Sequence, residues 1–142
     1  MTWYYQGTIV EELPEDCVGF VYLITNKANN RKYVGKKLAK FSKTTYKVVK
    51  QKNGVKKKKR IRSKIDSDWL TYFGSSPELS KDVELFGEDN FSREILHYCR
   101  SKSACSYLEA KEQFDRKVLE TMDYYNGHIQ IRVHGSHIIN KL

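Results

Sequence analysis

The segment between Asp16 and Asp66 contains no acidic residue and holds 17 of the 26 lysines and arginines of the chain. It carries a charge of +17, whereas the other residues, with 9 basic and 17 acidic side chains, sum to −8, which leaves a net charge of +9. Because like charges repel one another, the segment must either spread over a surface or lie against a polyanion. Nucleic acid is the usual polyanion, since binding it releases condensed counterions. A solubilising lysine-rich loop is the simpler alternative.

The length and patterning of the chain predict a single globular domain. A chain of 142 residues suits one domain, and no stretch is rich enough in Pro, Ser and Gly to be a linker, so we expect one unit over residues 1–142. The opening stretch "MTWYYQGTIVEELPED" lacks the features of a signal peptide, and no apolar run is long enough for a membrane span. Cys17, Cys99 and Cys105 form no CxxC pair. These features favour a soluble protein of the cytoplasm, without disulfides or a thiolate zinc site.

Two β-hairpins are predicted in the basic half of the chain. Residues 18–25, "VGFVYLIT", are typical of a strand, "NKANNR" is typical of a turn, and "KYVG" resumes a strand that we expect to end at Gly35. Further on, Asn53-Gly54 predicts a two-residue turn between the arms of a second hairpin. Residues 43–64 contain eleven lysines and arginines and few apolar side chains. We therefore expect this second hairpin to project from the domain and to be ordered mainly by its ligand.

The second half of the chain predicts three helices and one more strand. A short helix is expected over residues 67–73, and a second should start after Ser76, with Pro77 in its first turn, and stop at Gly87. Residues 90–99, "NFSREILHYC", predict a strand, and the apolar spacing that follows predicts a long helix from Ser103 to Met122. The tail, residues 128–142, has the alternation of an edge strand. The order strand, strand, insert, helix, helix, strand, helix places the chain in the α+β class.

The spacing of Tyr22 and Tyr33 resembles the signature of the GIY-YIG nuclease family. Taken alone, two tyrosines in strands are usually packing residues. Here Tyr22 of "VY" and Tyr33 of "YVG" lie eleven residues apart across a hairpin, and the second motif ends in a glycine. Similar elements follow in the family's order, namely "GSS" before a helix, "NFSREIL", a long helix with glutamates, and Asn126 in "DYYNG". The chain is most similar to the small Seg-like, homing-type endonucleases of T4-type phages, which share the character of "TWYY", "YVGKK", "SDW", "YFGSS" and "YLEAKxQF".

This resemblance implies a fold and its boundaries. It implies a single GIY-YIG-type domain with a small three-stranded antiparallel sheet flanked by helices, to which a basic β-hairpin has been added. The core would span about residues 18–127, the hairpin insert about 43–64 and the tail 128–142. The family's setting would place the protein in the cytoplasm of a bacterial host cell.

The resemblance also implies an activity, the metal-dependent hydrolysis of DNA phosphodiester bonds. In the family, the tyrosine matching Tyr22 accepts a proton from water, and the one matching Tyr33 hydrogen-bonds within the site. A glutamate on the long helix holds one Mg²⁺ or Mn²⁺, ions that prefer hard oxygen ligands. Gly35 would let the backbone approach the phosphate, and Gln113 and Asn126 would be supporting residues, although Asn126 before Gly127 also suits a plain turn.

The glutamate that holds the metal can be matched in two ways. The Seg-like pattern of a glutamate four residues before Gln-Phe selects Glu109, followed by Gln113 and Phe114. The homing-type pattern, with an amide and an aromatic directly after the glutamate, selects Glu112. We favour Glu109 and keep Glu112 as the alternative. A third interpretation makes both residues solvated helix acids that pair with neighbours such as Arg116.

The chain departs from the family at its cationic residue. Most members have an arginine eight to ten residues after the glycine that matches Gly35 of "YVG", the second motif. In that region this chain reads "KLAKFSKTT". The nearest cations are Lys36, Lys37 and Lys43, and Arg60 and Arg62 are more remote. We favour Lys37 because a lysine can supply the point charge, although it lacks the bidentate fork of arginine. In addition, the glycine of the first motif, Gly19, lies one residue further from its tyrosine than the family name implies.

Two functions follow from these observations, and both have DNA as the partner. The first is a GIY-YIG endonuclease, which could act as a homodimer. The second is a non-cleaving nucleic-acid-binding protein that keeps the scaffold, an alternative motivated by the missing arginine. In both, the expected DNA contacts are basic residues near the second motif and in the hairpin insert, namely Lys36, Lys43, Lys47, Lys56, Lys57, Lys58, Lys59, Arg60 and Arg62.

Overall fold

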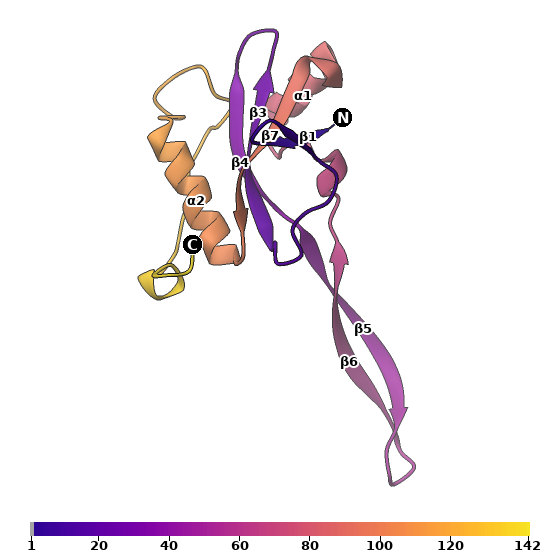
Figure 1. Cartoon of the computed structure of the whole chain (residues 1–142). Coiled ribbons are helices and arrows are strands. Elements are labelled where there is room, and N and C mark those ends of the chain that lie inside the picture. Colours follow the sequence, from indigo (N-terminus) through magenta and orange to yellow (C-terminus); the bar gives the residue numbers. More distant parts are fainter. Residues whose placement is uncertain (1) are drawn as a thin grey trace.

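The computed structural model describes residues 2–142, which fold around a five-stranded sheet (Figure 1). The strand order is β2-β1-β7-β3-β4, with β1 at Trp3–Tyr5, β2 at Thr8–Val10, β3 at Gly19–Asn26, β4 at Lys32–Leu38 and β7 at Phe91–Cys99. The three predicted strands are β3, β4 and β7, and they pair antiparallel. The prediction of a three-stranded sheet is nevertheless wrong, because an N-terminal hairpin adds β1, parallel to β7, and β2. The α+β class is confirmed.

The N-terminal hairpin was missed because each of its strands has only three residues. Gln6 and Gly7 connect the strands, and both have positive φ values, 49° and 81°. This is the conformation that a tight two-residue turn requires, and glycine adopts it at little cost. The sequence signal was present as "WYY" and "TIV" on either side of "QG". Trp3 is 1% exposed, so this short strand contributes a large side chain to the core.

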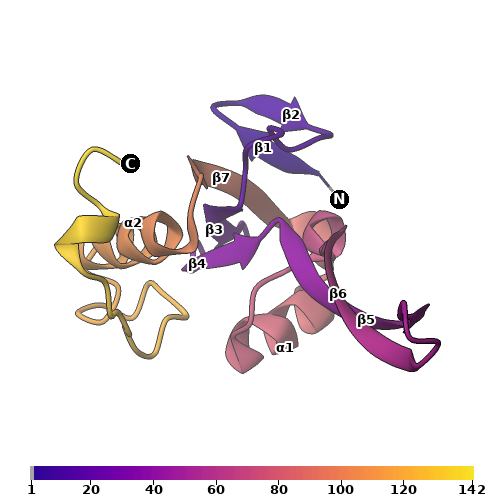
Figure 2. The same cartoon turned by 90° about the horizontal axis from the view of Figure 1, so that it is seen from below.

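The alternation of side chains along β3 divides the core into two layers. Phe20, Tyr22 and Ile24 point to one face, where they pack with Trp3 and Leu79. The residues between them point to the other face and pack with side chains of the long helix α2, as the set Val21, Leu23, Val34, Cys99, Ala104, Cys105 and Val118. Figure 2 shows the two main helices on different sides of the sheet. We call these the α1 face and the α2 face of the sheet.

The first main helix matches its prediction. Helix α1 spans Pro77–Phe86, and the hydroxyl of Ser76 accepts a hydrogen bond from the Leu79 amide, 3.3 Å away, as an N-cap. Gly87 ends the helix with a φ of 86°. The short helix expected over residues 67–73 is only a 3₁₀ turn, η1 at Trp69–Thr71. A second 3₁₀ turn, η2 at Glu88–Asn90, precedes β7.

The second main helix ends earlier than predicted. Helix α2 spans Lys102–Asp115, whereas the apolar spacing predicted a helix to Met122. Lys117 adopts a positive φ of 54°, and the Val118 amide donates to the carbonyl of Gln113 at 3.2 Å, which closes the helix. Val118 is then 1% exposed, because the reversed chain turns it into the core. The predicted range therefore included this core residue but placed it within a helix, whereas it follows the end of the helix.

The basic insert forms a separate two-stranded sheet, which extends far from the core (Figure 1). Strands β5, Lys40–Lys50, and β6, Lys56–Asp66, pair antiparallel over their whole lengths, so the predicted hairpin is confirmed but is longer than residues 43–64. The two-residue turn is wrong: the Gln51 amide donates to the Val55 carbonyl at 2.9 Å, and the loop Lys52-Asn53-Gly54 lies between them. Gly54 has a φ of 81°, typical of a three-residue hairpin loop.

The edge of the main sheet differs from prediction at two points. Strand β4 does not end at Gly35 but continues to Leu38 and leads through Ala39 into the hairpin. The tail forms no edge strand within residues 128–142, where the structure has only the 3₁₀ turn η3, Gly135–His137. Instead, the residues just before the tail flank β4, and the Tyr125 amide donates to the Lys32 carbonyl at 2.7 Å.

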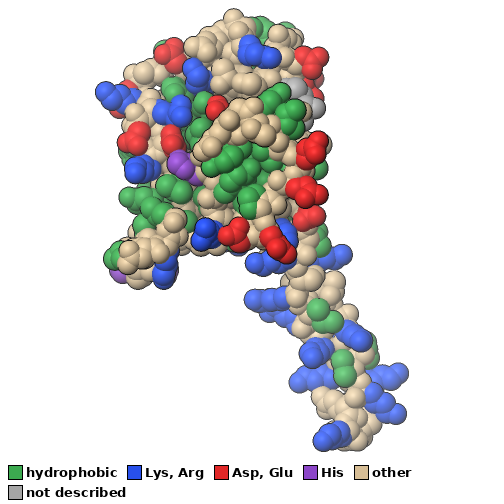
Figure 3. Space-filling model, viewed as in Figure 1, with side chains coloured by type: hydrophobic (Ala, Val, Ile, Leu, Met, Phe, Trp, Pro, Cys, Tyr) green, Lys and Arg blue, Asp and Glu red, His purple; other side chains and the backbone are tan. Residues whose placement is uncertain are grey.

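The basic and acidic side chains that are separated along the sequence are also separated in the structure. Figure 3 shows lysines and arginines along the projecting hairpin, whereas the acidic side chains lie on the globular part. Among residues 2–142, no helix is long and apolar enough to cross a membrane.

Candidate active site

The two motif tyrosines lie on the α1 face, on either side of Gly35. Strand pairing sets Tyr22 opposite Gly35 and Ile24 opposite Tyr33, and the two tyrosine rings are 6.1 Å apart between centroids. A Cβ atom placed on Gly35 would lie 2.6 Å from Cζ of Tyr22 and 2.8 Å from Cε1 of Tyr33. Any larger residue would therefore push both rings away, so the glycine is required for the tyrosines to meet.

Tyr22 is enclosed by aromatic rings. It is 1% exposed, and its ring meets the edge of Tyr72 at a centroid distance of 5.9 Å. Burial raises the pKa of Tyr22 well above its ordinary value, and the neighbouring Tyr72 and Tyr33 raise it further. Its hydroxyl oxygen lies close to Gly35 and would be 3.5 Å from a Cβ atom on Gly74. The phenol is thus neutral at neutral pH, and two positions without side chains flank its oxygen.

Tyr33 is more accessible and borders a cavity. Its hydroxyl lies 3.1 Å from the hydroxyl oxygen of Ser75, just before helix α1. Burial raises the pKa of Tyr33, and the hydrogen bond with Ser75 opposes part of this effect. The cavity, with a volume of about 530 Å³, is lined by Tyr33, Lys36, Ser75, Ser76, Pro77, Glu78, Glu109, Gln113, Tyr125, Asn126, Gly127, His128 and Gln130.

This cavity lies across the open edge of the sheet. Tyr33 belongs to the α1 face, whereas Lys36, an odd number of residues further along the same strand, belongs to the α2 face. Helix α2 adds Glu109 and Gln113 from one side, and the start of α1 adds Ser75 and its neighbours from the other. Residues that are far apart in sequence and on opposite faces of the sheet therefore meet at one edge.

Glu109 is the α2 carboxylate that reaches this cavity. It is half-buried, and burial raises its pKa, while the charge of Lys36 and a hydrogen bond from the Lys36 backbone amide oppose the rise. The Lys36 ammonium also donates to the hydroxyl of Ser106 at 2.6 Å. The structure thus brings together the predicted Glu109, Tyr33 and Lys36.

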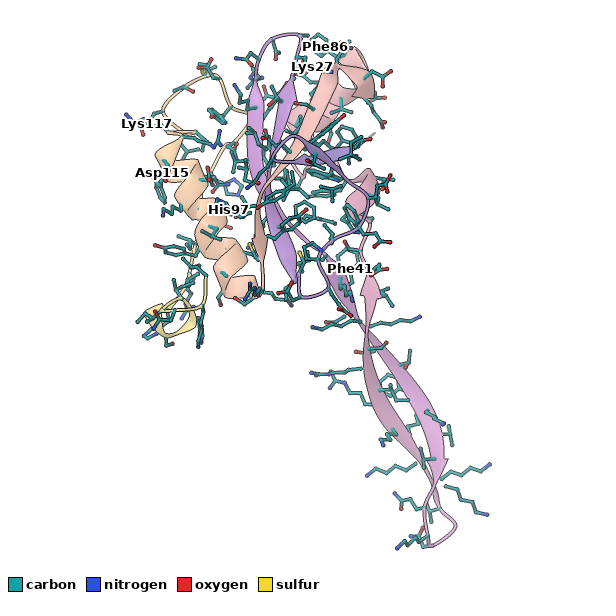
Figure 4. All side chains as sticks on the ribbon, in the orientation of Figure 1. Lys27, Phe41, Phe86, His97, Asp115 and Lys117 are labelled. Carbon is teal, nitrogen blue, oxygen red and sulfur yellow. The ribbon has the colours of Figure 1, made fainter. Side chains whose placement is uncertain are left out.

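Glu112 points to other partners. One of its carboxylate oxygens is 2.8 Å from Nε2 of His97, and the other accepts from Nε of Arg116 at 2.9 Å. Burial alone would raise the pKa of Glu112, but the hydrogen bonds from His97 and Arg116 outweigh it and lower the pKa. His97, labelled in Figure 4, lies on β7 beside α2. Glu112 therefore links α2 to the sheet and does not line the cavity.

The two predicted supporting amides hold the edge strand in place. Asn126 accepts from the Val34 amide at 3.0 Å and donates to the Val34 carbonyl at 2.8 Å, so its side chain pairs with β4 as another strand would. Gln113, 5% exposed, donates to the same carbonyl at 3.1 Å. Both amides thereby fix the backbone between Tyr33 and Gly35. Asn126 is thus more than a turn residue.

Lys37 is not brought to the cavity. It is on the α1 face, 9% exposed, with its ammonium 2.5 Å from Oδ1 of Asp68 and 4.1 Å from the ring centroid of Tyr72. The lysine that lines the cavity is its neighbour Lys36. The other predicted DNA-binding residues, Lys43, Lys47, Lys56, Lys57, Lys58, Lys59, Arg60 and Arg62, are exposed on the hairpin and lie outside the cavity.

Sequence reasoning assigned no catalytic role to Tyr72, Ser75 or His128. Ser75 carried a signal as part of "GSS", but tertiary folding alone brings His128 to the cavity and Tyr72 against the ring of Tyr22. Within the described part of the chain, no group of three or more His, Cys, Asp or Glu side chains could hold a metal ion.

Comparison with protein families identifies the chain. The family model described as "Putative endonuclease segE, GIY-YIG domain" matches residues 3–129, which include all five strands of the main sheet, the hairpin and both main helices. Neither the curated proteins nor the solved structures gave a match. Since the matched region covers most of the sequence, the chain belongs to the SegE family of GIY-YIG endonuclease domains.

Proposed function

We propose that this protein is a metal-dependent endonuclease that hydrolyses DNA phosphodiester bonds at the edge of β4. The observation that carries the proposal is the meeting of Tyr33, Lys36 and Glu109 around one cavity, next to the contact between Tyr22 and Gly35. Membership of an endonuclease domain family supports the same reaction and substrate.

The donor set at the cavity fits a single Mg²⁺ or Mn²⁺. Mg²⁺ is usually held by one or two carboxylates together with substrate phosphate and water, so the one carboxylate of Glu109 suffices. Glu78 also lines the cavity, but it is paired with Arg31 at 2.7 Å. When bound, the ion would stabilise negative charge on the scissile phosphate and on the leaving oxygen. Burial raises the pKa of Glu109, so its charged form is costly in the free protein. A bound cation would offset this cost.

The protein side chains have distinct roles in this proposal. Lys36, rather than Lys37, supplies the point charge that faces the phosphate, because Lys37 is held by Asp68. Tyr33, fixed by Ser75, hydrogen-bonds within the site. Tyr22 accepts a proton from the attacking water, and Gly35 makes room for the ring of Tyr22 beside that of Tyr33. The raised pKa of Tyr22 means that only a small fraction is ready to act as a base at neutral pH.

Plasmid cleavage tests the proposal directly. Supercoiled plasmid should be nicked or linearised in Mg²⁺ and remain intact in EDTA. Tyr22→Phe, Tyr33→Phe and Glu109→Gln should each reduce the rate by about 10²-fold or more, while cooperative melting and DNA binding remain. Loss of cooperative melting in all three variants would assign the tyrosines to packing alone.

The second candidate is a DNA-binding protein without cleavage. It is favoured by the engagement of Lys37 with Asp68, at 2.5 Å, in a chain that has no arginine at the family's position. This function would be indicated if the purified protein bound DNA but left plasmid intact in both Mg²⁺ and Mn²⁺.

A further inference from the structure

The projecting hairpin has two unlike faces. Residues paired across an antiparallel ribbon share a face, and alternate residues along each strand point to opposite faces. Because the register pairs Lys50 with Lys56 and Lys40 with Asp66, even-numbered residues share one face and odd-numbered residues share the other. We call these the even face and the odd face.

The even face is the continuous cationic one. On β6, every even-numbered position from 56 to 64 is lysine or arginine, whereas the odd-numbered positions change from lysine to Ile61, Ser63 and Ile65. Besides Lys40 at its base, the even face has six cations: Lys50, Lys56, Lys58, Arg60, Arg62 and Lys64. The cations of the odd face are Lys43, Lys47, Lys57 and Lys59, and the uncharged pair of Thr45 and Ile61 separates Lys43 from the other three.

The apolar side chains confirm that the faces differ. Phe41, Val49 and Ile65 of the odd face are 40%, 39% and 46% exposed, whereas Tyr46 and Val48 of the even face are 67% and 58% exposed. The apolar residues of the odd face are thus more covered than those of the even face. Figure 3 shows basic side chains reaching outward along the hairpin.

Contacts at the base of the hairpin show which way each face points. The ring centroid of Phe41, on the odd face, lies 4.9 Å from the Lys37 ammonium. Since Lys37 is on the α1 face, the odd face starts on that side of the sheet. Lys40, Ser42 and Lys64, on the even face, line a cleft together with Lys102 of α2. At Ser42 and Lys64 the even face therefore lies on the α2 side of the sheet, the side to which Lys36 contributes its side chain, whereas Lys40 and Asp66 also line a second cleft beside Trp69. Glu15 and Asp16 also line this cleft, so the uncompensated charge lies further out.

We propose that the even face of the hairpin binds the phosphate backbone of duplex DNA and guides one strand past Lys40 toward Lys36 in the cavity. Alternate residues of a strand are roughly 6.8 Å apart, and phosphates of one DNA strand recur every ~3.4 Å along the axis. The cations of β6, two residues apart, are therefore spaced on the length scale of the phosphates of a DNA backbone. A two-stranded ribbon also fits the major groove of B-DNA. The inference rests on the proposed function for the identity of the polyanion.

Two charge-matched triple variants test this face assignment. The even-face variant is Lys50→Gln, Lys56→Gln, Lys58→Gln, and the odd-face control is Lys47→Gln, Lys57→Gln, Lys59→Gln. Each removes one lysine from β5 and two from β6, all exposed and in the outer half of the hairpin. Both therefore change long-range attraction equally, and a difference between them reports on direct contact.

The measurement is binding to a duplex DNA in EDTA at several salt concentrations. Each phosphate contact contributes about 0.9 to the slope of log K against log salt, so the even-face variant should flatten the slope by about 2.7 units and the odd-face control by less than one. Equal flattening in both variants, or a larger effect of the odd-face control, would overturn the face assignment.

Two further measurements distinguish DNA binding by the even face from RNA binding and from the cleavage activity. Duplex RNA of the same sequence has a deep, narrow major groove, so it should bind more weakly and without preference between the faces. Equal, face-dependent RNA binding would overturn the DNA inference. Plasmid cleavage in Mg²⁺ is scored separately: intact plasmid with a face-dependent salt slope would reject the endonuclease and leave the binding surface standing.

Discussion

At the scale of single residues, the two α2 glutamates show how environment separates identical side chains. Glu109 has few hydrogen-bond partners, and burial raises its pKa, so its charge costs stability in the free protein. Glu112 is held by His97 and Arg116, which lower its pKa, so its charge stabilises the fold. A carboxylate kept at such a cost is better explained by ligand binding than by packing.

Opposite effects of Glu109→Gln and Glu112→Gln are the first prediction. At pH 7, Glu109→Gln should abolish cleavage and leave the melting temperature equal or higher, whereas Glu112→Gln should cost about 1–2 kcal/mol of unfolding free energy and retain cleavage. Because the pKa of Glu112 is lowered on folding, its stabilisation is present above about pH 4.3 and is lost as the pH falls through the folded pKa. Urea unfolding at pH 7 and pH 3 checks this. Loss of cleavage only in Glu112→Gln would show that Glu112, and not Glu109, is the metal ligand.

The pH dependence of cleavage tests Tyr22 as the base. Because the pKa of Tyr22 is raised, the fraction in phenolate form should grow about tenfold per pH unit throughout the neutral range. Single-turnover cleavage at saturating DNA and Mg²⁺ should therefore rise with a log slope near one from pH 6 to 9, with no plateau. Any residual rate of Tyr22→Phe should lack this slope. A wild-type profile that is flat above pH 7 would exclude Tyr22 as the group that titrates.

At the scale of elements, the hairpin and the core are energetically separate. The residues of β5 and β6 are exposed except for Ile61, which is half-exposed, so these strands pair with one another and bury little against the main sheet. The strands that hold the site, β3 and β4, are instead fixed by the core and by the amides of Gln113 and Asn126. Binding and chemistry are thereby assigned to different elements.

Shortening the hairpin should therefore change binding without changing the fold. Replacing residues 47–59 by Asn-Gly keeps Tyr46 opposite Arg60 and removes the outer half of the ribbon. The melting temperature should stay within about 3 °C of the wild type, while the salt slope of DNA binding flattens by several units. Calorimetry and salt titration check the two parts. A large loss of melting temperature would show that the ribbon supports the core, and an unchanged slope would make it a solvated loop.

At the scale of the whole molecule, Trp3 ties the N-terminal strand to the site. Its indole N–H donates to the Trp69 carbonyl at 2.7 Å, and its ring packs 5.1 Å from Phe20 and 5.5 Å from Tyr22 between centroids. The guanidinium of Arg93 lies 4.5 Å from the same ring. Trp3 thus connects the sheet to the η1 turn and to the aromatic surroundings of Tyr22.

Trp3→Ala should destabilise the whole domain. Removing this buried ring should cost about 3–5 kcal/mol and reduce cleavage even in the fraction that remains folded, because Tyr22 loses a wall of its pocket. Tyr4→Ala is the matched control, since Tyr4 is the neighbouring aromatic and is 40% exposed, so it should cost less than 1 kcal/mol. Urea unfolding of both variants measures the difference. Equal costs would show that the N-terminal strand is not part of the core.

The sequence by itself determined the features that depend on local chemistry and spacing. The hairpin around Tyr22 and Tyr33, the capped helix after Ser76 and the basic ribbon are set by strand periodicity, an N-cap and a run of like charges, all short-range properties. Tertiary structure decided the rest. The neighbours of Glu109, the contact of Glu112 with His97, the engagement of Lys37 by Asp68 and the addition of the N-terminal strand depend on residues far away in sequence. Such contacts form only when distant segments of the chain have come together, because each partner is supplied by a different element of the fold.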